Sequence, residues 1–230
     1  MWRKLYFLLF FLFTISNYAQ DSIVHFSDAI KRNIKPYKLA SAVALENKDF
    51  IESKRLFDSL VQYKLSGTQF DNFTIKGYKS KKIILNKIKK PILLVTYASW
   101  CVRNKGDAPA LNELATKYTN ELQVVIVFWD KKKNLKKIRN QFNSKIKICY
   151  ANEAYHNDFK IVATLKHTLG MPTVYYLDED KKVITINRIK NQNKVKIPTE
   201  AAFAMSYTLF KEMINTTNSK LSLNTTPRKL

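Results

Sequence analysis

One cysteine lies at the boundary between two segments of different periodicity. Cys101 follows the apolar run 91–96, Pro-Ile-Leu-Leu-Val-Thr, which is rich in β-forming residues and predicts a buried strand. Residues 108–118 then show apolar positions at helical spacing. A thiol at a helix N-terminus faces unpaired backbone N–H groups, which favour the thiolate, and Arg103 and Lys105 add positive charge. We therefore expect a lowered pKa for Cys101, with attack on a disulfide or oxidation to a sulfenic acid as its chemistry.

Cys149 is the second of two cysteines, and its neighbours over 146–150 alternate as in a strand. A buried free cysteine often fills apolar space, and we favour that role here. The alternative is a remote resolving thiol, because the carboxyl end of this strand would lie near Cys101 in an open α/β sheet. The even number of cysteines also permits one Cys101–Cys149 disulfide.

The composition indicates a globular chain with a basic surface. Of 230 residues, 46% are apolar and 13% aromatic, enough for a core without disulfide staples, and the formal net charge is +22. The lysines are spread along the chain, and neither an RNA-binding signature nor zinc-finger spacing occurs, so we predict no nucleic-acid partner. The spread of the lysines favours a solvated surface, and weak association with an anionic membrane surface is the alternative use of the charge. The histidines lack metal-ligand spacing, and we predict neither a metal nor a cofactor.

Residues 1–19 have the features of a secretory signal peptide. Arg3 and Lys4 form a positive start, residues 5–15 form an apolar core too short to span a bilayer comfortably, and Ala19 precedes the expected cleavage site. We therefore predict export to the periplasm or the cell envelope, where conditions are oxidising. The alternative is a segment that stays uncleaved and anchors the protein.

The pattern after residue 19 predicts three further parts. Residues 20–66 form a polar helical extension, an αα-hairpin in which Pro36 marks a break. Residues 67–215 alternate strands with helices, and residues 216–230 form a flexible polar tail. Within the main domain we expect an N-terminal β-hairpin, a basic helix over 130–142, a helix over 153–168 with Phe159 facing inward, and a last helix over 199–214.

Four sequence pieces, in this order, are similar to the thioredoxin-like superfamily, and within it to exported TlpA/redoxin-type thiol-disulfide proteins. They are the hairpin around Gly77, the pair Trp100-Cys101, the helix start Asp107-Ala108-Pro109, and the loop Gly170-Met171-Pro172-Thr173. The likeness runs from Gly67 to Ile214. It implies an α/β, thioredoxin-like fold with a mixed central sheet flanked by helices, to which the N-terminal β-hairpin and the helical extension are added.

The resemblance also implies roles for the residues around Cys101. The family motif is Trp-Cys-x-x-Cys, and Asn104 stands where the second cysteine would be. Reduction by that motif needs one thiol to attack and a second to resolve, so an ordinary dithiol cycle through residues 101 and 104 is excluded. Trp100 either covers Cys101 or packs at the rim of the site. Asp107 either relays a proton or is a solvent-facing carboxylate that suits the helix dipole.

Met171 and Pro172 resemble the family's cis-proline loop. A cis bond there would expose the Met171 backbone for pairing with an extended client segment. The alternative is a proline that only shapes the loop. A peroxiredoxin site is excluded, because Leu94 and Ala98 occupy the positions of that family's proline and threonine.

The sequence therefore predicts an exported thioredoxin-like protein that exchanges thiols with a cysteine-containing client protein or a small thiol through Cys101 alone. The alternative is a non-catalytic binding module that keeps the fold and has lost redox turnover. A third hypothesis, a redox pair of Cys101 and Cys149, requires the two sulfur atoms to come within bonding range.

Overall fold

The structure, a computed structural model, describes residues 23–80, 82–101, 104–189 and 197–224, of which residues 217–224 are described by their backbone only. The expected signal peptide lies outside the described residues, as do Val102, Arg103 and the last six residues of the expected tail.

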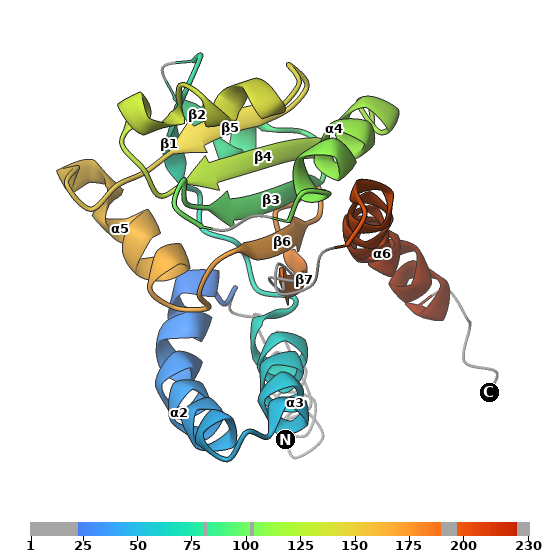
Figure 1. Cartoon of the computed structure of the whole chain (residues 1–230). Helices are drawn as coiled ribbons and strands as arrows, with labels where there is room; N and C mark the ends of the chain where they lie inside the picture. Colours follow the sequence, from blue (N-terminus) through green and yellow to red (C-terminus); the bar gives the residue numbers. More distant parts are fainter. Residues whose placement is uncertain (1–22, 81, 102–103, 190–196, 225–230) are drawn as a thin grey trace, which may run out of the picture.

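A seven-stranded mixed sheet forms the centre of the molecule (Figure 1), in the order β2-β1-β5-β4-β3-β6-β7. β4 runs parallel to both of its neighbours, and all other neighbouring strands are antiparallel. The pairing of β1 with β2 confirms the expected N-terminal β-hairpin. The strands are β1 Thr74–Gly77, β2 Ile83–Ile84, β3 Ile92–Tyr97, β4 Gln123–Phe128, β5 Lys147–Tyr150, β6 Thr173–Leu177 and β7 Val183–Arg188.

Helices cover both faces of the sheet and give three layers (Figure 1), with α2, α3 and α5 on one face and α4 and α6 on the other. β3 shows why both faces are covered: Ile92 and Leu94 point into one core, Leu93 and Val95 into the other, and all four are fully buried. The helices are α2 Phe26–Glu46, α3 Phe50–Leu60 followed by a π-helical turn Val61–Leu65, α4 Asp107–Lys117, α5 Phe159–Ile161 followed by a π-helical turn Val162–Lys166, and α6 Thr199–Asn224.

The helical extension is fastened to the sheet by a buried carboxylate and a stacked cation. Asp71 accepts hydrogen bonds from the Ser27 N–H and from the Ser27 Oγ, both at 2.8 Å, and so caps the start of α2 from a distant part of the chain. Arg188, at the end of β7, places its guanidinium 4.4 Å from the centre of the Phe57 ring in α3. The extension is therefore packed against the rest of the protein.

Pro36 lies inside α2 and does not end the helix, so the expected break is wrong. Proline removes one helical hydrogen bond and disfavours the helical conformation of the residue before it. However, Phe26, Ile30 and Tyr37 of the same helix are buried in the core. The burial of this helix face outweighs the local cost of the proline.

The expected basic helix over 130–142 is wrong. The connection between β4 and β5 forms two short 3-10 turns, Lys132–Leu135 and Ile138–Gln141. A side-chain amide of α4 binds the end of this connection: the Asn112 Nδ2 donates to the Gln141 carbonyl, and the Asn112 Oδ1 accepts from the Asn143 N–H, both at 2.8 Å. These contacts hold the end of the second turn against α4.

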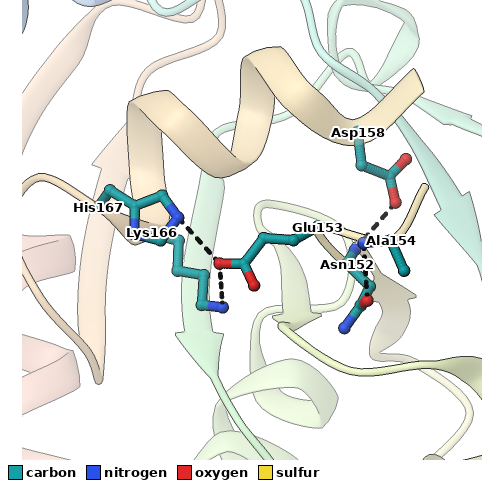
Figure 2. A network of polar contacts seen from close by, with 6 residues as sticks. All are labelled: Asn152, Glu153, Ala154, Asp158, Lys166 and His167. Atoms are coloured by element: carbon teal, nitrogen blue, oxygen red, sulfur yellow. Dashed lines mark hydrogen bonds and ion pairs between the residues drawn. The ribbon is translucent and has the colours of Figure 1, made fainter. Parts of the chain in front are cut away.

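The expected continuous helix over 153–168 is also wrong. Figure 2 shows the polar network that bends this segment: the Glu153 carboxylate accepts from the Lys166 Nζ at 2.7 Å and lies 2.9 Å from the His167 Nε2. Asp158 accepts from the Asn152 N–H at 2.9 Å. Because these contacts join the start of the segment to its middle and its end, it forms short 3-10, α and π-helical pieces.

One helix face and one helix end differ from expectation. Phe159 is 77% exposed and does not face inward. α6 begins at Thr199, as expected, and continues to Asn224, beyond the expected end at Ile214. Its buried residue Phe210 packs in the same core as α4. In the described part of the chain, no helix combines the length and the apolar character needed to cross a membrane.

Candidate functional site

Three chain segments meet at one edge of the sheet. Thr96, near the end of β3, is the register partner of Thr173 at the start of β6, and Tyr97 is the partner of Phe128 at the end of β4. The Thr96 Oγ1 also accepts from the Thr173 N–H at 3.2 Å. Three loops therefore share this edge: the loop after β3, the loop after β4 and the loop before β6. Cys101 lies on the loop after β3.

The loop before β6 has the geometry that the resemblance implied. The Met171–Pro172 peptide bond is cis, and Gly170 before it has a φ of +83°, a conformation that favours glycine. Met171 and Cys101 pack against the same core cluster. Among the described residues, none forms a hydrogen bond with the Met171 N–H or carbonyl. This stretch of backbone is thus unused by the described part of the chain.

Cys101 is half-buried and lies in a turn, where its N–H donates to the Ala98 carbonyl at 3.0 Å. α4 begins only at Asp107, so the expected position of Cys101 at a helix N-terminus is wrong. Burial raises the pKa of the Cys101 thiol above its ordinary value, and the charge of Asp130 raises it further, while a backbone hydrogen bond at Ala98 acts in the opposite direction. The predicted lowering is also wrong, because the helix begins too far along the chain to offset the desolvation of the thiolate.

Asp130 was not among the predicted site residues, and its buried carboxylate holds the turn that contains Cys101. Asp130 is 3% exposed and accepts from the Ser99 N–H at 2.7 Å and from the Ser99 Oγ at 2.5 Å. The signal in the sequence is that Ser99 and Asp130 each follow closely after an apolar run that predicts a buried strand, and the structure pairs these strands so that Tyr97 lies opposite Phe128. Parallel neighbours that end together place the residues after them side by side.

The Asp130→Asn variant should ionise its Cys101 thiol at lower pH than the wild type. The amide still accepts from the Ser99 N–H and can donate to the Ser99 Oγ, so the turn keeps its geometry while the negative charge is lost. Because charged hydrogen bonds become neutral ones, the free energy of unfolding should fall by about 1–2 kcal/mol. The pH profile of Cys101 alkylation, in a Cys149→Ala background, measures the first effect and urea unfolding the second.

The exposed residue Asp28 of α2 offers the matched control for the thiol: Asp28→Asn removes the same charge and should leave the alkylation profile unchanged, while the loss of a first-turn carboxylate should lower the free energy of unfolding by no more than about 0.3–1 kcal/mol. An alkylation profile of Asp130→Asn that coincides with that of the wild type would show that burial alone sets the pKa of Cys101.

Asp107 is 3% exposed and is not the solvent-facing carboxylate that was one of its two expected forms. Its carboxylate accepts from the Tyr97 hydroxyl at 3.0 Å and from the Ser206 Oγ of α6 at 2.8 Å. The Asn104 Nδ2 donates to the same Ser206 Oγ at 3.1 Å. One polar network therefore joins the position of the missing second cysteine to α6 and to the start of α4.

A cavity of about 530 Å³ lies beside this network. Its described lining includes Asn104, Asp107 and several residues of α6, together with Asn187 and Arg188 of β7. Cys101 is not among the described lining residues. The cavity thus reaches the network around Asn104 but not the thiol.

The remaining predicted residues lie in contrasting environments. Cys149 in β5 has no exposed surface and forms no disulfide with Cys101, and burial raises its pKa to about 12. Because almost none of such a thiol is ionised at neutral pH, this environment favours the packing role over the resolving one. Trp100 is 68% exposed, so most of its ring surface is open. Among the described residues, no cluster of three or more His, Cys, Asp or Glu could hold a metal ion.

The AhpC/TSA family model matches residues 66–186, which is more than half of the chain. The chain belongs to the AhpC/TSA family. One curated relative of this AhpC/TSA protein is thioredoxin-like protein YneN of Bacillus subtilis (strain 168), 28% identical over 118 residues, which cover 49% of the chain and 65% of the relative. Another is thiol-disulfide oxidoreductase ResA of Bacillus thuringiensis (strain Al Hakam), 30% identical over 123 residues, which cover 51% of the chain and 66% of the relative. The chain spans just under two thirds of the length of these relatives.

Solved structures similar to this AhpC/TSA protein include the thioredoxin domain of thiol-disulfide oxidoreductase BVU-2223 from Bacteroides vulgatus, with a TM-score of 0.49 and 16% identity, covering 65% of this chain and 98% of that one. StoA from Bacillus subtilis has a TM-score of 0.40 and 15% identity, covering 50% of this chain and 86% of that one. The mixed sheet between two helical layers and the family match confirm the expected α/β, thioredoxin-like fold.

Proposed function

We propose that this AhpC/TSA-family protein exchanges thiols with disulfides through Cys101 alone, with a cysteine-containing protein or a small thiol as its partner. The observation that carries the proposal is a partly exposed cysteine at the sheet edge that also holds the cis Met171–Pro172 loop. The Met171 backbone offers hydrogen-bonding groups to an extended partner segment. The name of the relative ResA, a thiol-disulfide oxidoreductase, supports the same reaction class.

The proposed reaction has two steps. The Cys101 thiolate attacks one sulfur of the partner's disulfide; a bond between Cys101 and the partner forms, the old disulfide bond breaks, and the released sulfur leaves as a thiolate that takes up a proton. The thiolate of a small external thiol then attacks the partner's sulfur in this mixed disulfide; a disulfide between the external thiol and the partner forms, the bond to Cys101 breaks, and Cys101 leaves as a thiolate. Asn104 supplies no thiol for the second step, so its rate depends on the concentration of the external thiol.

The raised pKa of Cys101 determines how fast this exchange can run. Only the thiolate attacks, so we expect slow exchange at neutral pH that accelerates as the pH rises toward the pKa of the thiol. Asp107 serves as a positioning residue in this proposal, because its bonds to Tyr97 and Ser206 tie α4 to β3 and to α6.

A second candidate function is a binding module that keeps the partner-binding edge and has lost redox turnover. The raised pKa of Cys101 favours this function. Asn104 favours it too, because it stands where the motif of TlpA-type proteins has a cysteine and its side chain is hydrogen-bonded to Ser206. The two functions differ in one requirement, because only exchange needs the sulfur of Cys101.

Cys101→Ser should abolish covalent capture of partners completely. Wild-type protein recovered from cells after thiol blocking should carry mixed disulfides, seen as larger species on non-reducing gels that disappear with reductant. Cys149→Ala, which removes only the buried thiol, should keep these species. If the wild type forms no mixed disulfide and Cys101→Ser retains the same partners, the exchange proposal fails and the binding module stands.

Export is part of the proposal and is supported by the amino-terminal sequence alone, with its positive start, its short apolar core and Ala19. The net charge of +22 supports weak association with an anionic envelope surface, which added salt would release.

A further inference from the structure

A second cavity lies beside β5, two strands away from β3 and its cysteine. Its volume is about 440 Å³, which is in the range of small-molecule sites. Its walls come from β5, from the chain just after β1, and from the connection that forms 3-10 turns in place of a full helix. Neither Cys101 nor the proposed function is involved in it.

The described lining of this cavity carries three cations and no carboxylate. Lys79, Arg139 and Lys147 line it, and none of its described lining residues is Asp or Glu. Within the described part of the chain, none of these three cations forms an ion pair. Like charges gathered around one cavity repel each other, and a bound anion would offset that repulsion.

Arg139 provides the second and independent observation. It is half-buried, and its Nε is closed to solvent, so a ligand in the cavity can reach only the terminal guanidinium nitrogens. The guanidinium carbon lies 5.0 Å from the centre of the Tyr78 ring, and the Tyr78 N–H is bonded to the Ile148 carbonyl of β5 at 2.8 Å, so the cation is held against a fixed aromatic face. An oxyanion is the acceptor that the terminal guanidinium nitrogens bind best.

The rest of the wall combines apolar residues with four polar ones, Ser80, Asn140, Asn143 and Ser144. Phe142 and Ile146 are buried, and Ile148 and Tyr78 are half-buried, so the cavity pairs a cationic group with hydrocarbon and aromatic surface. An inorganic anion would leave this apolar surface without a partner. A ligand with a compact apolar body would bury it and gain the corresponding hydrophobic free energy.

We propose that this cavity binds a small organic anion, whose oxyanion head pairs with Arg139 and with Lys79 and Lys147 at the rim, and whose apolar body packs against Tyr78 and Ile148. Calorimetric titration of the purified protein with phenyl phosphate tests this, with inorganic phosphate and benzyl alcohol as probes for the head alone and the body alone. We expect saturable one-to-one binding of phenyl phosphate, about tenfold weaker binding of inorganic phosphate, and no binding of benzyl alcohol up to about 10 mM. No saturable binding of phenyl phosphate, or equal affinity for inorganic phosphate, would overturn the proposal.

Charge variants locate the binding. Arg139→Gln should weaken phenyl phosphate binding by at least about tenfold, because the charged hydrogen bonds to the oxyanion are lost. Lys136→Gln removes the same charge from an exposed position of the same connection that does not line the cavity, and should change the affinity by less than about twofold.

The double variant Lys79→Gln/Lys147→Gln alters only exposed rim positions and gives the same test if Arg139→Gln does not fold. We expect about fivefold weaker binding from it, since two rim charges attract the anion at longer range. If Arg139→Gln folds and binds phenyl phosphate as tightly as the wild type, the assignment is contradicted. If Arg139→Gln does not fold, the same result from the double variant contradicts it.

Discussion

Gly106→Ala should destabilise the protein by at least about 3 kcal/mol, at the upper end of what overpacking costs. A Cβ at this position would lie 2.0 Å from the Ala202 carbonyl oxygen and 2.5 Å from the Phe203 nitrogen of α6. Gly106 has a φ of −78°, which any residue adopts, so the cost is purely steric. The added methyl group must push α6 away from the start of α4, and urea unfolding measures the loss.

The neighbours of Gly106 provide two controls. Ala202→Gly should not rescue Gly106→Ala, because the clash is with the backbone of α6 and not with a side chain. Ala204→Ser changes an exposed position of the same helix and should cost less than about 0.5 kcal/mol. Rescue by Ala202→Gly would contradict the close backbone approach.

Asn104→Cys should convert the protein into a dithiol oxidoreductase. A thiol at this position is attached to the same loop as Cys101 and acts at a high effective concentration. We expect an intramolecular disulfide, seen as the loss of two hydrogen atoms by mass spectrometry, and about 100-fold faster turnover in insulin reduction at low external thiol. The lost hydrogen bond to Ser206 should lower the free energy of unfolding by about 1 kcal/mol.

Asn104→Ser loses the same amide and brings no thiol, so its turnover should stay at the wild-type level. The variant Cys101→Ser/Asn104→Cys tests whether the new thiol works alone, and it should be inactive. Two thiols that remain unbridged in oxidised Asn104→Cys would mean that the turn around Cys101 holds the two positions too far apart.

The sequence by itself determined the strands and the proline loop. Residues 92–97 and 123–128 are apolar at most positions on both faces, with Thr96 and Gln123 as the polar exceptions, because a strand covered on both faces needs no polar side. Met171-Pro172 follows a glycine and precedes a strand, and the resemblance implied the cis bond that the structure has. The absence of a second cysteine at Asn104 is likewise a fact of the sequence, and it excludes an ordinary dithiol cycle.

Local signals failed where contacts between distant segments compete with them. Pro36 stays inside a helix because the helix face is buried in the core. The segment 130–142 forms only two 3-10 turns, and Asn112 of α4 is hydrogen-bonded to its end. Apolar periodicity records which residues become buried, but it carries no information on such side-chain hydrogen bonds.

The electrostatics of the site were decided only by the tertiary structure. Cys101 has the neighbours in sequence that would favour a thiolate, yet its pKa is raised, because burial and the charge of Asp130 depend on chain segments that are distant in sequence. The burial of Asp107 and its bond to Ser206 likewise depend on how α6 packs. The sequence determined which sulfur is present at this edge of the sheet, and the packing of β4, α4 and α6 around it decided how readily that sulfur can ionise.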